Sequence, residues 1–359
     1  MDKRLRGPLL LALAALIWGM AFSAQSEAGK HMGPFAFTAA RSFITFFTLL
    51  LFEAVGSRGR RQAQAVQTAP LSAYIKVGAP LGAVMFAATA LQQLGLTIDP
   101  SAAKSGFITA LYIVIVPILG LIFFRRRVGA RMWLGVALSL VGLVLLCVKE
   151  GFTIGSGDLV TLACAVMFAV HIVAVDRFAG DLSAPRLCCA QFGFTGLLAL
   201  IVALFTETVR ISDMLACWPS LLYVGVCSGA IGYTLQIAGQ KSTEPTLASI
   251  ILCLESVFAA VGGWLLLGQV LSAREIAGCA VMLAACVLAQ LPEKRRVEMC
   301  IRDRSGRGAV QKGPRQQGRA AGHPRARRAD DHHLAGDAQL CAAHRRAEGH
   351  ARAYRRFRG

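Results

Sequence analysis

The chain has 359 residues, of which 55% are hydrophobic and only 16% are charged, with a formal net charge of +18 at pH 7 and a mean hydropathy of +0.55. This composition is too apolar for an ordinary soluble domain, in which about 25% of the residues are charged. It indicates a protein whose surface faces lipid.

Apolar runs long enough to cross a bilayer follow one another along the chain. A helix needs about 20 apolar residues to cross a hydrocarbon core about 30 Å thick. Ten runs meet this requirement, at residues 7–27, 34–55, 72–95, 101–124, 131–148, 157–176, 186–206, 218–240, 246–267 and 272–291. The first run is not a signal peptide, because it is long, lacks a convincing small-residue cleavage site and precedes further spans of the same kind. The sequence therefore predicts an all-α integral membrane protein with ten transmembrane helices.

The basic residues of the loops predict the orientation. With ten spans, alternate loops face the same side of the membrane. One set of loops and span ends holds sixteen Lys and Arg residues, whereas the other holds four, namely Lys30, Lys149, Arg210 and Arg274. Because the cytoplasmic side carries the excess of cations, both the N-terminus and the end of the tenth span are expected in the cytoplasm. We expect a multi-pass protein of a bacterial cytoplasmic membrane.

The first five spans are echoed in order by the second five. The echoes are LQQLG at 91–95 with LQIAG at 235–239, Asp99-Pro100 with Glu244-Pro245, and RMWLGVAL at 131–138 with REIAGCAV at 274–281. Their offsets of 144, 145 and 143 residues differ by no more than loops permit. A unit of five spans ends on the opposite side from its start, so its repeat is inverted about an axis in the membrane plane. We expect one five-helix repeat over residues 1–150 and a second over 151–298.

Several motifs resemble a known transporter family. They are WGMAF at 18–22, the arginine in the second span and, above all, LESVFAAVGGWLLLGQVLSAREIAGCAVMLAACVLAQ at 254–290. These motifs resemble the EamA-type transporters of the drug/metabolite transporter superfamily, over about residues 5–296, and LYIVIVPILGLIFFRRRVGARMWLGVALSLVGLVLLC resembles the same module in the first half. The chain departs from the family pattern at Glu255-Ser256, where Glu-Pro is frequent, and at Gly268-Gln269, where Gly-Glu is frequent. Without the proline, a kink in the ninth span has less support.

The resemblance implies a fold and an activity. It implies ten helices around a central cavity that is lined by spans one, three, four, six, eight and nine. It also implies the transport of small organic solutes.

The sequence carries no motif typical of an enzyme or of a cofactor site. It has no H-E-x-x-H, P-loop or G-x-G-x-x-G motif and no C-x-x-C pair. Most of the eleven cysteines lie within or at the ends of apolar spans, as small packing residues do. We therefore expect no enzymatic activity, no cofactor and no metal site.

Titratable groups inside the spans are the candidates for function. Glu255 lies about 15 Å into its span, near the midplane, where an ionisable group is costly and suggests function. The alternative is a protonated carboxyl group that hydrogen-bonds a neighbouring helix. His171 is the second proton-coupling candidate, because imidazole titrates near neutral pH, although packing alone also explains a lone histidine. Arg41 is expected to brace the helices, since the resemblance leaves span two outside the cavity.

Neutral donors and rings complete the expected substrate site. Beside Glu255, the candidate cavity residues are Trp18, Gln92, Gln93, Tyr112, Tyr233 and Gln236. Side chains of these types suit a polar or amphipathic solute.

These features together predict a secondary transporter. It would move small organic metabolites, amino-acid-like or drug-like, by alternating access, in proton-coupled export. The expected partners are the lipid bilayer and the solute, with no nucleic acid, and a homodimer stays open. One alternative is a nucleotide-sugar or phosphate-ester exchanger, for which Lys76 and Lys104 are the near cations. Another is a non-transport membrane scaffold or sensor.

The composition changes abruptly after the last span. Residues 305–359 hold thirteen Arg and Lys against four acidic residues, and such a basic, Ala- and Gly-rich stretch is typical of disorder. The junction reads MCIRDR at 299–304, which resembles the translation of a transposon-end sequencing adaptor. We interpret 299–359 as a disordered basic tail that arose as a sequencing or assembly artefact. The alternative is a native basic arm that binds anionic lipid or nucleic acid.

Overall fold

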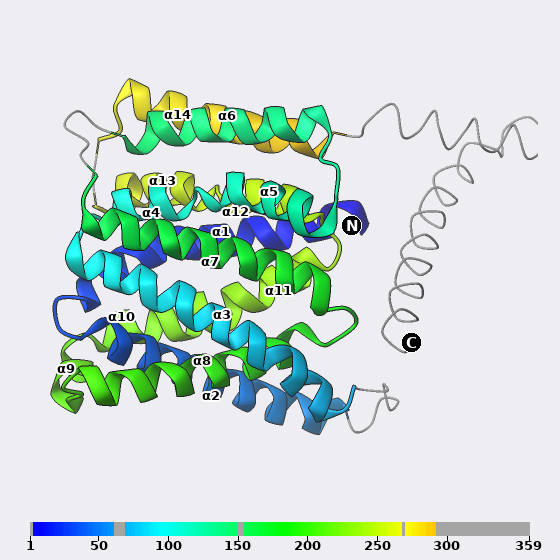
Figure 1. The fold of residues 1–359 in the computed structure, drawn as a ribbon. Coiled ribbons are helices and arrows are strands. Elements are labelled where there is room, and N and C mark those ends of the chain that lie inside the picture. Colours follow the sequence, from blue (N-terminus) through cyan, green and yellow to red (C-terminus); the bar gives the residue numbers. More distant parts are fainter. Residues whose placement is uncertain (1–2, 61–68, 149–153, 268–269, 292–359) are drawn as a thin grey trace, which may run out of the picture. The chain divides into compact units, whose positions relative to one another are not determined.

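The computed structural model describes residues 3–60, 69–148, 154–267 and 270–291 (Figure 1). Every regular element in these ranges is a helix. The predicted tail at 299–359 and the loop that contains Gly151 lie outside the described residues.

The described chain forms fourteen α-helices and one π-helix. They are α1 (Lys3–Ala28), α2 (Pro34–Arg60), α3 (Leu71–Ile98), α4 (Ala102–Thr109), α5 (Tyr112–Phe124), α6 (Ala130–Cys147), α7 (Ser156–Phe178), α8 (Ala184–Thr206), α9 (Ile211–Ala216), α10 (Trp218–Leu222), η1 (Tyr223–Gly232), α11 (Tyr233–Gln240), α12 (Pro245–Leu252), α13 (Glu255–Leu267) and α14 (Ala273–Gln290).

Nine stretches in the described ranges are long and apolar enough to cross a membrane. They are Leu5–Ala28, Pro34–Val55, Leu71–Ile98, Lys104–Phe124, Ala130–Cys147, Ser156–Phe178, Ala184–Thr206, Trp218–Gln240 and Ala273–Gln290. Each falls on one of the apolar runs that the sequence predicts. The remaining expected span, 246–267, falls on α12 and α13, where the apolar stretch Pro245–Val261 is shorter.

Two spans are interrupted in mid-course. The turn at Ala110 and Leu111 separates α4 from α5, and the turn at Cys253 and Leu254 separates α12 from α13. At each turn the backbone tightens to an i→i−3 hydrogen bond, from the Leu111 amide to the Ile108 carbonyl over 3.2 Å and from the Leu254 amide to Ile251 over 3.1 Å. Neither turn contains a proline. The missing proline after Glu255 therefore does not keep this span continuous.

A π-helix forms the middle of the stretch Trp218–Gln240. Side chains from neighbouring helices donate hydrogen bonds to two of its backbone carbonyls. The Trp18 indole donates to the Ser228 carbonyl over 3.2 Å, and the Thr45 hydroxyl donates to the Gly225 carbonyl over 2.7 Å. Both α1 and α2 are therefore fastened to η1.

The helices pack in long pairs, most extensively α2 with α8, α3 with α7 and α6 with α14, the last pair being plain in Figure 1. Between α6 and α14 the backbones approach closely at Gly142 and Gly278. A Cβ atom at Gly278 would lie 2.7 Å from the Gly142 carbonyl oxygen, so a larger residue would force the helices apart. Large apolar side chains such as Phe47 and Phe205 stay exposed on the outside, as suits a surface that faces lipid.

An ion triad links the helices at one end of the bundle. Lys104 at the start of α4 lies 3.0 Å from Asp99 and 2.7 Å from Asp158 at the start of α7. The hydrogen bond from Lys104 lowers the pKa of Asp99, so this carboxylate is charged at neutral pH. The triad joins the end of α3 and the start of α4 to α7.

Two further ion pairs link helices at the other end of the bundle, where α7 ends and α8 begins. Arg126, just after α5, lies 2.7 Å from Asp176 near the end of α7. Arg186 at the start of α8 lies 2.7 Å from Glu53 near the end of α2.

Candidate functional site

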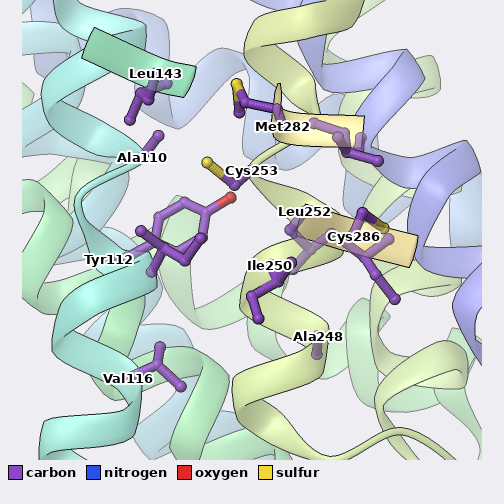
Figure 2. Close-up of a cluster of buried hydrophobic side chains, with 14 of the residues drawn as sticks. Ala110, Tyr112, Val116, Leu143, Ala248, Ile250, Leu252, Cys253, Met282 and Cys286 are labelled. Carbon is purple, nitrogen blue, oxygen red and sulfur yellow. The ribbon is translucent and has the colours of Figure 1, made fainter. Parts of the chain in front are cut away.

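The two helix interruptions meet in the interior. Tyr112 is the first residue of α5 and Glu255 is the first residue of α13, and each is only 4% exposed. The Tyr112 hydroxyl donates a hydrogen bond to Glu255 Oε1 over 3.3 Å. Figure 2 shows Tyr112 extending from α5 toward the turn that holds Cys253, just before α13. Two of the predicted site residues, one from each half of the chain, are thus in contact.

Glu255 is a buried acid that belongs to no ion pair within the described ranges. A charge on its carboxyl group would be costly in this apolar interior, which marks Glu255 as a candidate functional residue. The backbone of α1 packs directly on the same turn, because Gly19 leaves room for the Glu255 carbonyl.

An aromatic cluster lies around Tyr233. The Trp18 ring stacks at a tilt with its centroid 4.6 Å from that of Tyr233, and the Phe192 ring meets Tyr233 edge-on at 5.1 Å. Tyr233 is buried, whereas Trp18 is half-buried and donates its indole N–H to η1. The predicted site residues Trp18 and Tyr233 are therefore in ring contact, and the indole N–H of Trp18 is already used in its hydrogen bond to η1.

His171 belongs to a different set of contacts from Glu255. It is fully buried on α7, and its Nε2 lies 3.1 Å from the Oε1 atom of Gln191 on α8. Its Nδ1 atom has no hydrogen-bond partner in the described structure. The ring also meets Tyr233 edge-on, with centroids 6.4 Å apart. The two proton-coupling candidates are therefore not hydrogen-bonded to each other.

The adjacent glutamines of α3, Gln92 and Gln93, form hydrogen bonds with different helices. Gln92 donates from Nε2 to the Thr109 hydroxyl over 3.4 Å, at the end of α4. Gln93 donates to the backbone carbonyl of Gln25 over 3.1 Å, and its own Oε1 has no partner within the described chain. Only Gln92 therefore lies against the interrupted span α4–α5.

Gln236 of α11 is buried, and its Oε1 atom likewise has no partner in the described part of the chain. An orphaned buried acceptor of this kind calls for a donor, which a solute could supply.

Sequence reasoning missed Gln25, Thr109 and Gln191. Thr109 and Gln191 are isolated polar residues within apolar runs, whereas Gln25 lies near the polar end of its run, and each contacts a predicted site residue. The signal that could have found Thr109 and Gln191 is their isolation, because a polar side chain inside a membrane span needs a partner.

Comparison with known proteins identifies the family. Residues 5–148 and 155–291 each match the model of the EamA-like transporter family. The chain belongs to this family. The resemblance drawn from the motifs is therefore confirmed, and the protein is a multi-pass membrane transporter of the drug/metabolite transporter superfamily.

Relatives of this EamA-like transporter include proteins from distant organisms. It is 30% identical over 294 residues to a protein of Archaeoglobus fulgidus described as an uncharacterized transporter, covering 80% of this chain and 87% of the relative. It is 28% identical over 295 residues to a chloroplastic WAT1-related protein of Arabidopsis thaliana, covering 77% of this chain and 67% of that protein. A protein of known crystal structure aligns with a TM-score of 0.64 at 18% identity, covering 79% of this chain and 96% of the other, and supports the fold alone.

One surface pocket of this EamA-like transporter lies away from the candidate residues. It is formed by α5, α7 and α12 near Arg126, Asp176 and Glu244, and has room for about one water, with a volume of about 10 Å³. None of the predicted site residues lines it. We therefore base the site on the contact between Tyr112 and Glu255 rather than on this pocket.

Proposed function

We propose that this protein is a secondary transporter that exports small organic solutes by alternating access, with Glu255 as its proton-coupling group. The observation that carries the proposal is the contact between Tyr112 and Glu255, where two interrupted helices meet in the interior. Transporters commonly build substrate and ion sites from discontinuous helices at the interface of two repeats, near the midplane.

Pseudo-symmetric contacts support ten spans in two inverted repeats, over 1–150 and 151–298. Tyr112 and Glu255 are 143 residues apart, which is the same offset as between RMWLGVAL and REIAGCAV. In the proposed repeats they would occupy equivalent positions, and a contact between equivalent positions is what a pseudo-two-fold axis between the halves requires. The pairs α2 with α8 and α6 with α14 likewise join equivalent spans.

The ion pairs at both ends of the bundle support alternating access. Lys104 to Asp158 at one end, and Arg126 to Asp176 and Arg186 to Glu53 at the other, each join the first half to the second. Opening either end to solvent requires its own pairs to separate while the other end stays closed. Rocking of one half against the other about the central contact would do this.

The charge distribution supports a cytoplasmic N-terminus and a cytoplasmic end of the last span in a bacterial cytoplasmic membrane. We expect topology reporters fused after Arg127 and after Arg296 to read as cytoplasmic and a reporter fused after Gly151 to read as external. Alkaline phosphatase and fluorescent-protein fusions measure this. A cytoplasmic reading at Gly151 would contradict the five-span repeat and its inversion.

The phosphate-ester exchanger has less support. Lys76 is exposed, and Lys104 is already held by Asp99 and Asp158, so neither offers a free cation in the interior. A scaffold or sensor would not need an interrupted helix pair with a buried acid.

Counterflow in proteoliposomes tests the transport proposal directly. Vesicles loaded with one unlabelled solute from a metabolite panel are expected to take up the same labelled solute, transiently and above the level of protein-free vesicles. A panel of organic acids, amino acids, amines and neutral solutes in which none is exchanged would contradict transport by this protein.

A further inference from the structure

Arg41 carries a buried positive charge that forms no ion pair with an acidic side chain of the described ranges. It lies on α2, is 5% exposed, and its guanidinium keeps its proton at any physiological pH. The ion pairs within the described chain do not include it. A buried charge is costly unless it is paired, so Arg41 needs either a structural or a functional explanation.

Within the described structure, the hydrogen-bond partner and the ring partner of the guanidinium are both neutral. Its Nη1 atom donates to the Gln25 side-chain oxygen over 2.9 Å, and its Cζ atom lies 5.8 Å from the centre of the Phe37 ring. The Nε donor has no hydrogen-bond partner in the described structure. With an amide oxygen and a ring face as partners, the Nε donor lacks a hydrogen-bond acceptor and the positive charge lacks a negative counter-charge within the described structure.

Arg41 lies on the side of α2 that packs against the π-helix η1, where its carbonyl oxygen is 3.2 Å from the position that a Cβ atom of Gly225 would take. One turn after it, Thr45 fastens α2 to the π-helix at Gly225. Tyr233, the first residue of α11, directly follows η1 and carries the ring contacts with Trp18 and Phe192. The helix segment that holds Arg41 is therefore fastened to the same stretch, Trp218–Gln240, that contributes Tyr233 to the candidate site.

We propose that Arg41 receives the carboxylate of the transported solute. This inference rests on the proposed transport function and adds the substrate class. A carboxylate would accept two parallel hydrogen bonds from Nε and a terminal nitrogen of the guanidinium. It would replace the Gln25 amide as acceptor, exchanging a neutral partner for one of matching charge.

The charge balance favours a carboxylate over a phosphate ester. Arg41 is the sole lysine or arginine among the buried side chains of the described ranges. A phosphate ester brings nearly two negative charges, whereas one guanidinium balances one.

Matched probes test the substrate class in counterflow. The probes are L-phenylalanine, 3-phenylpropanoate and 2-phenylethylamine, because they share a ring that suits Trp18 and Tyr233 and differ in their charged groups. Wild-type vesicles are expected to exchange at least one of the two carboxylates and not the amine. Exchange of the amine without either carboxylate would overturn the role of Arg41 while leaving transport intact.

The isosteric change Gln25→Glu separates solute binding from bracing. It places a carboxylate beside Arg41 permanently, at the 2.9 Å contact that the amide now makes. If Arg41 binds the solute, the variant should fold with undiminished thermal stability and lose exchange of the carboxylate probe. If Arg41 only braces α1 and α2, the new ion pair should strengthen the brace and leave exchange unchanged, which would overturn the proposal.

Arg41→Gln provides the second variant, with Arg210→Gln as its control. Loss of a charge-assisted hydrogen bond should raise the half-saturation concentration of the carboxylate probe about ten- to hundredfold. Arg210 is an exposed residue just before the short helix α9, so its replacement should leave that concentration unchanged. If both Arg41→Gln and Gln25→Glu exchange the carboxylate probe as the wild type does, the role of Arg41 is overturned and the transport proposal is not affected. No exchange of any panel solute by the wild type would overturn transport itself, and this proposal with it.

Discussion

Glu255→Gln is expected to abolish transport driven by a pH gradient while leaving a folded, inserted protein. The amide keeps the shape of the carboxyl group and can still accept the hydrogen bond from Tyr112, but it cannot bind or release a proton. Because a titrating group that acts in the coupled step contributes at least about two orders of magnitude, gradient-driven accumulation should fall by about that factor. The measurement is uptake of the counterflow-active solute into proteoliposomes with and without an imposed pH gradient.

Exchange without a gradient distinguishes coupling from folding. A coupling defect leaves counterflow near the wild-type rate, whereas a folding defect removes both activities. Glu275→Gln is the matched control, because Glu275 is an exposed acid of the same half that caps the start of α14 through Ser272. Gradient-driven uptake at the wild-type rate in Glu255→Gln would make Glu255 a packing residue.

The pair Tyr112 and Glu255 shows which part of the site could be predicted from the sequence and which could not. Glu255 stands out because an acid inside an apolar run is rare, and its depth follows from counting residues. Its contact with Tyr112 is not visible in either segment alone. The 143-residue offset pairs the two positions in sequence, but their contact is seen only in the folded structure.

The helix interruptions show where sequence reasoning about the fold stops. Long apolar runs predict spans, because lipid requires every backbone group to be satisfied within a helix. Ala110, Leu111, Cys253 and Leu254 are ordinary residues in such runs, so no local signal places a turn at them. Tertiary packing sets these turns, and it also sets the π-helix Tyr223–Gly232, whose glycines allow close approach without specifying it.

The side of its helix that Arg41 faces could not be predicted from the sequence. The sequence favours a brace for Arg41, since the resemblance leaves span two outside the cavity, but sequence periodicity does not say which face meets lipid when all faces are apolar. The contacts with Gln25 and the π-helix connection at Thr45 place it inside.

Gly19→Ala is expected to destabilise the protein and to impair transport, because it lies where α1 meets the start of α13. A Cβ atom there would lie 2.6 Å from the Glu255 carbonyl oxygen, 2.8 Å from the Ala259 amide nitrogen and 3.0 Å from the Phe258 Cβ atom. These are backbone or Cβ atoms that cannot swing away, so α1 and α13 must move apart. Overpacking of this kind costs about 1–3 kcal/mol. Thermal unfolding in detergent measures the loss of stability.

Gly120→Ala is the control for Gly19→Ala. Gly120 lies in α5, and no atom lies within 4 Å of the position that its Cβ atom would take. Since alanine favours a helix over glycine by up to about 1 kcal/mol, this variant should unfold at the wild-type temperature or slightly above it. Gly19→Ala should unfold at a lower temperature and exchange solute more slowly, because the displaced α1 carries Trp18 away from Tyr233 and shifts the turn that positions Glu255. Equal unfolding temperatures and equal exchange rates for the two variants would contradict the close approach of α1 to this site.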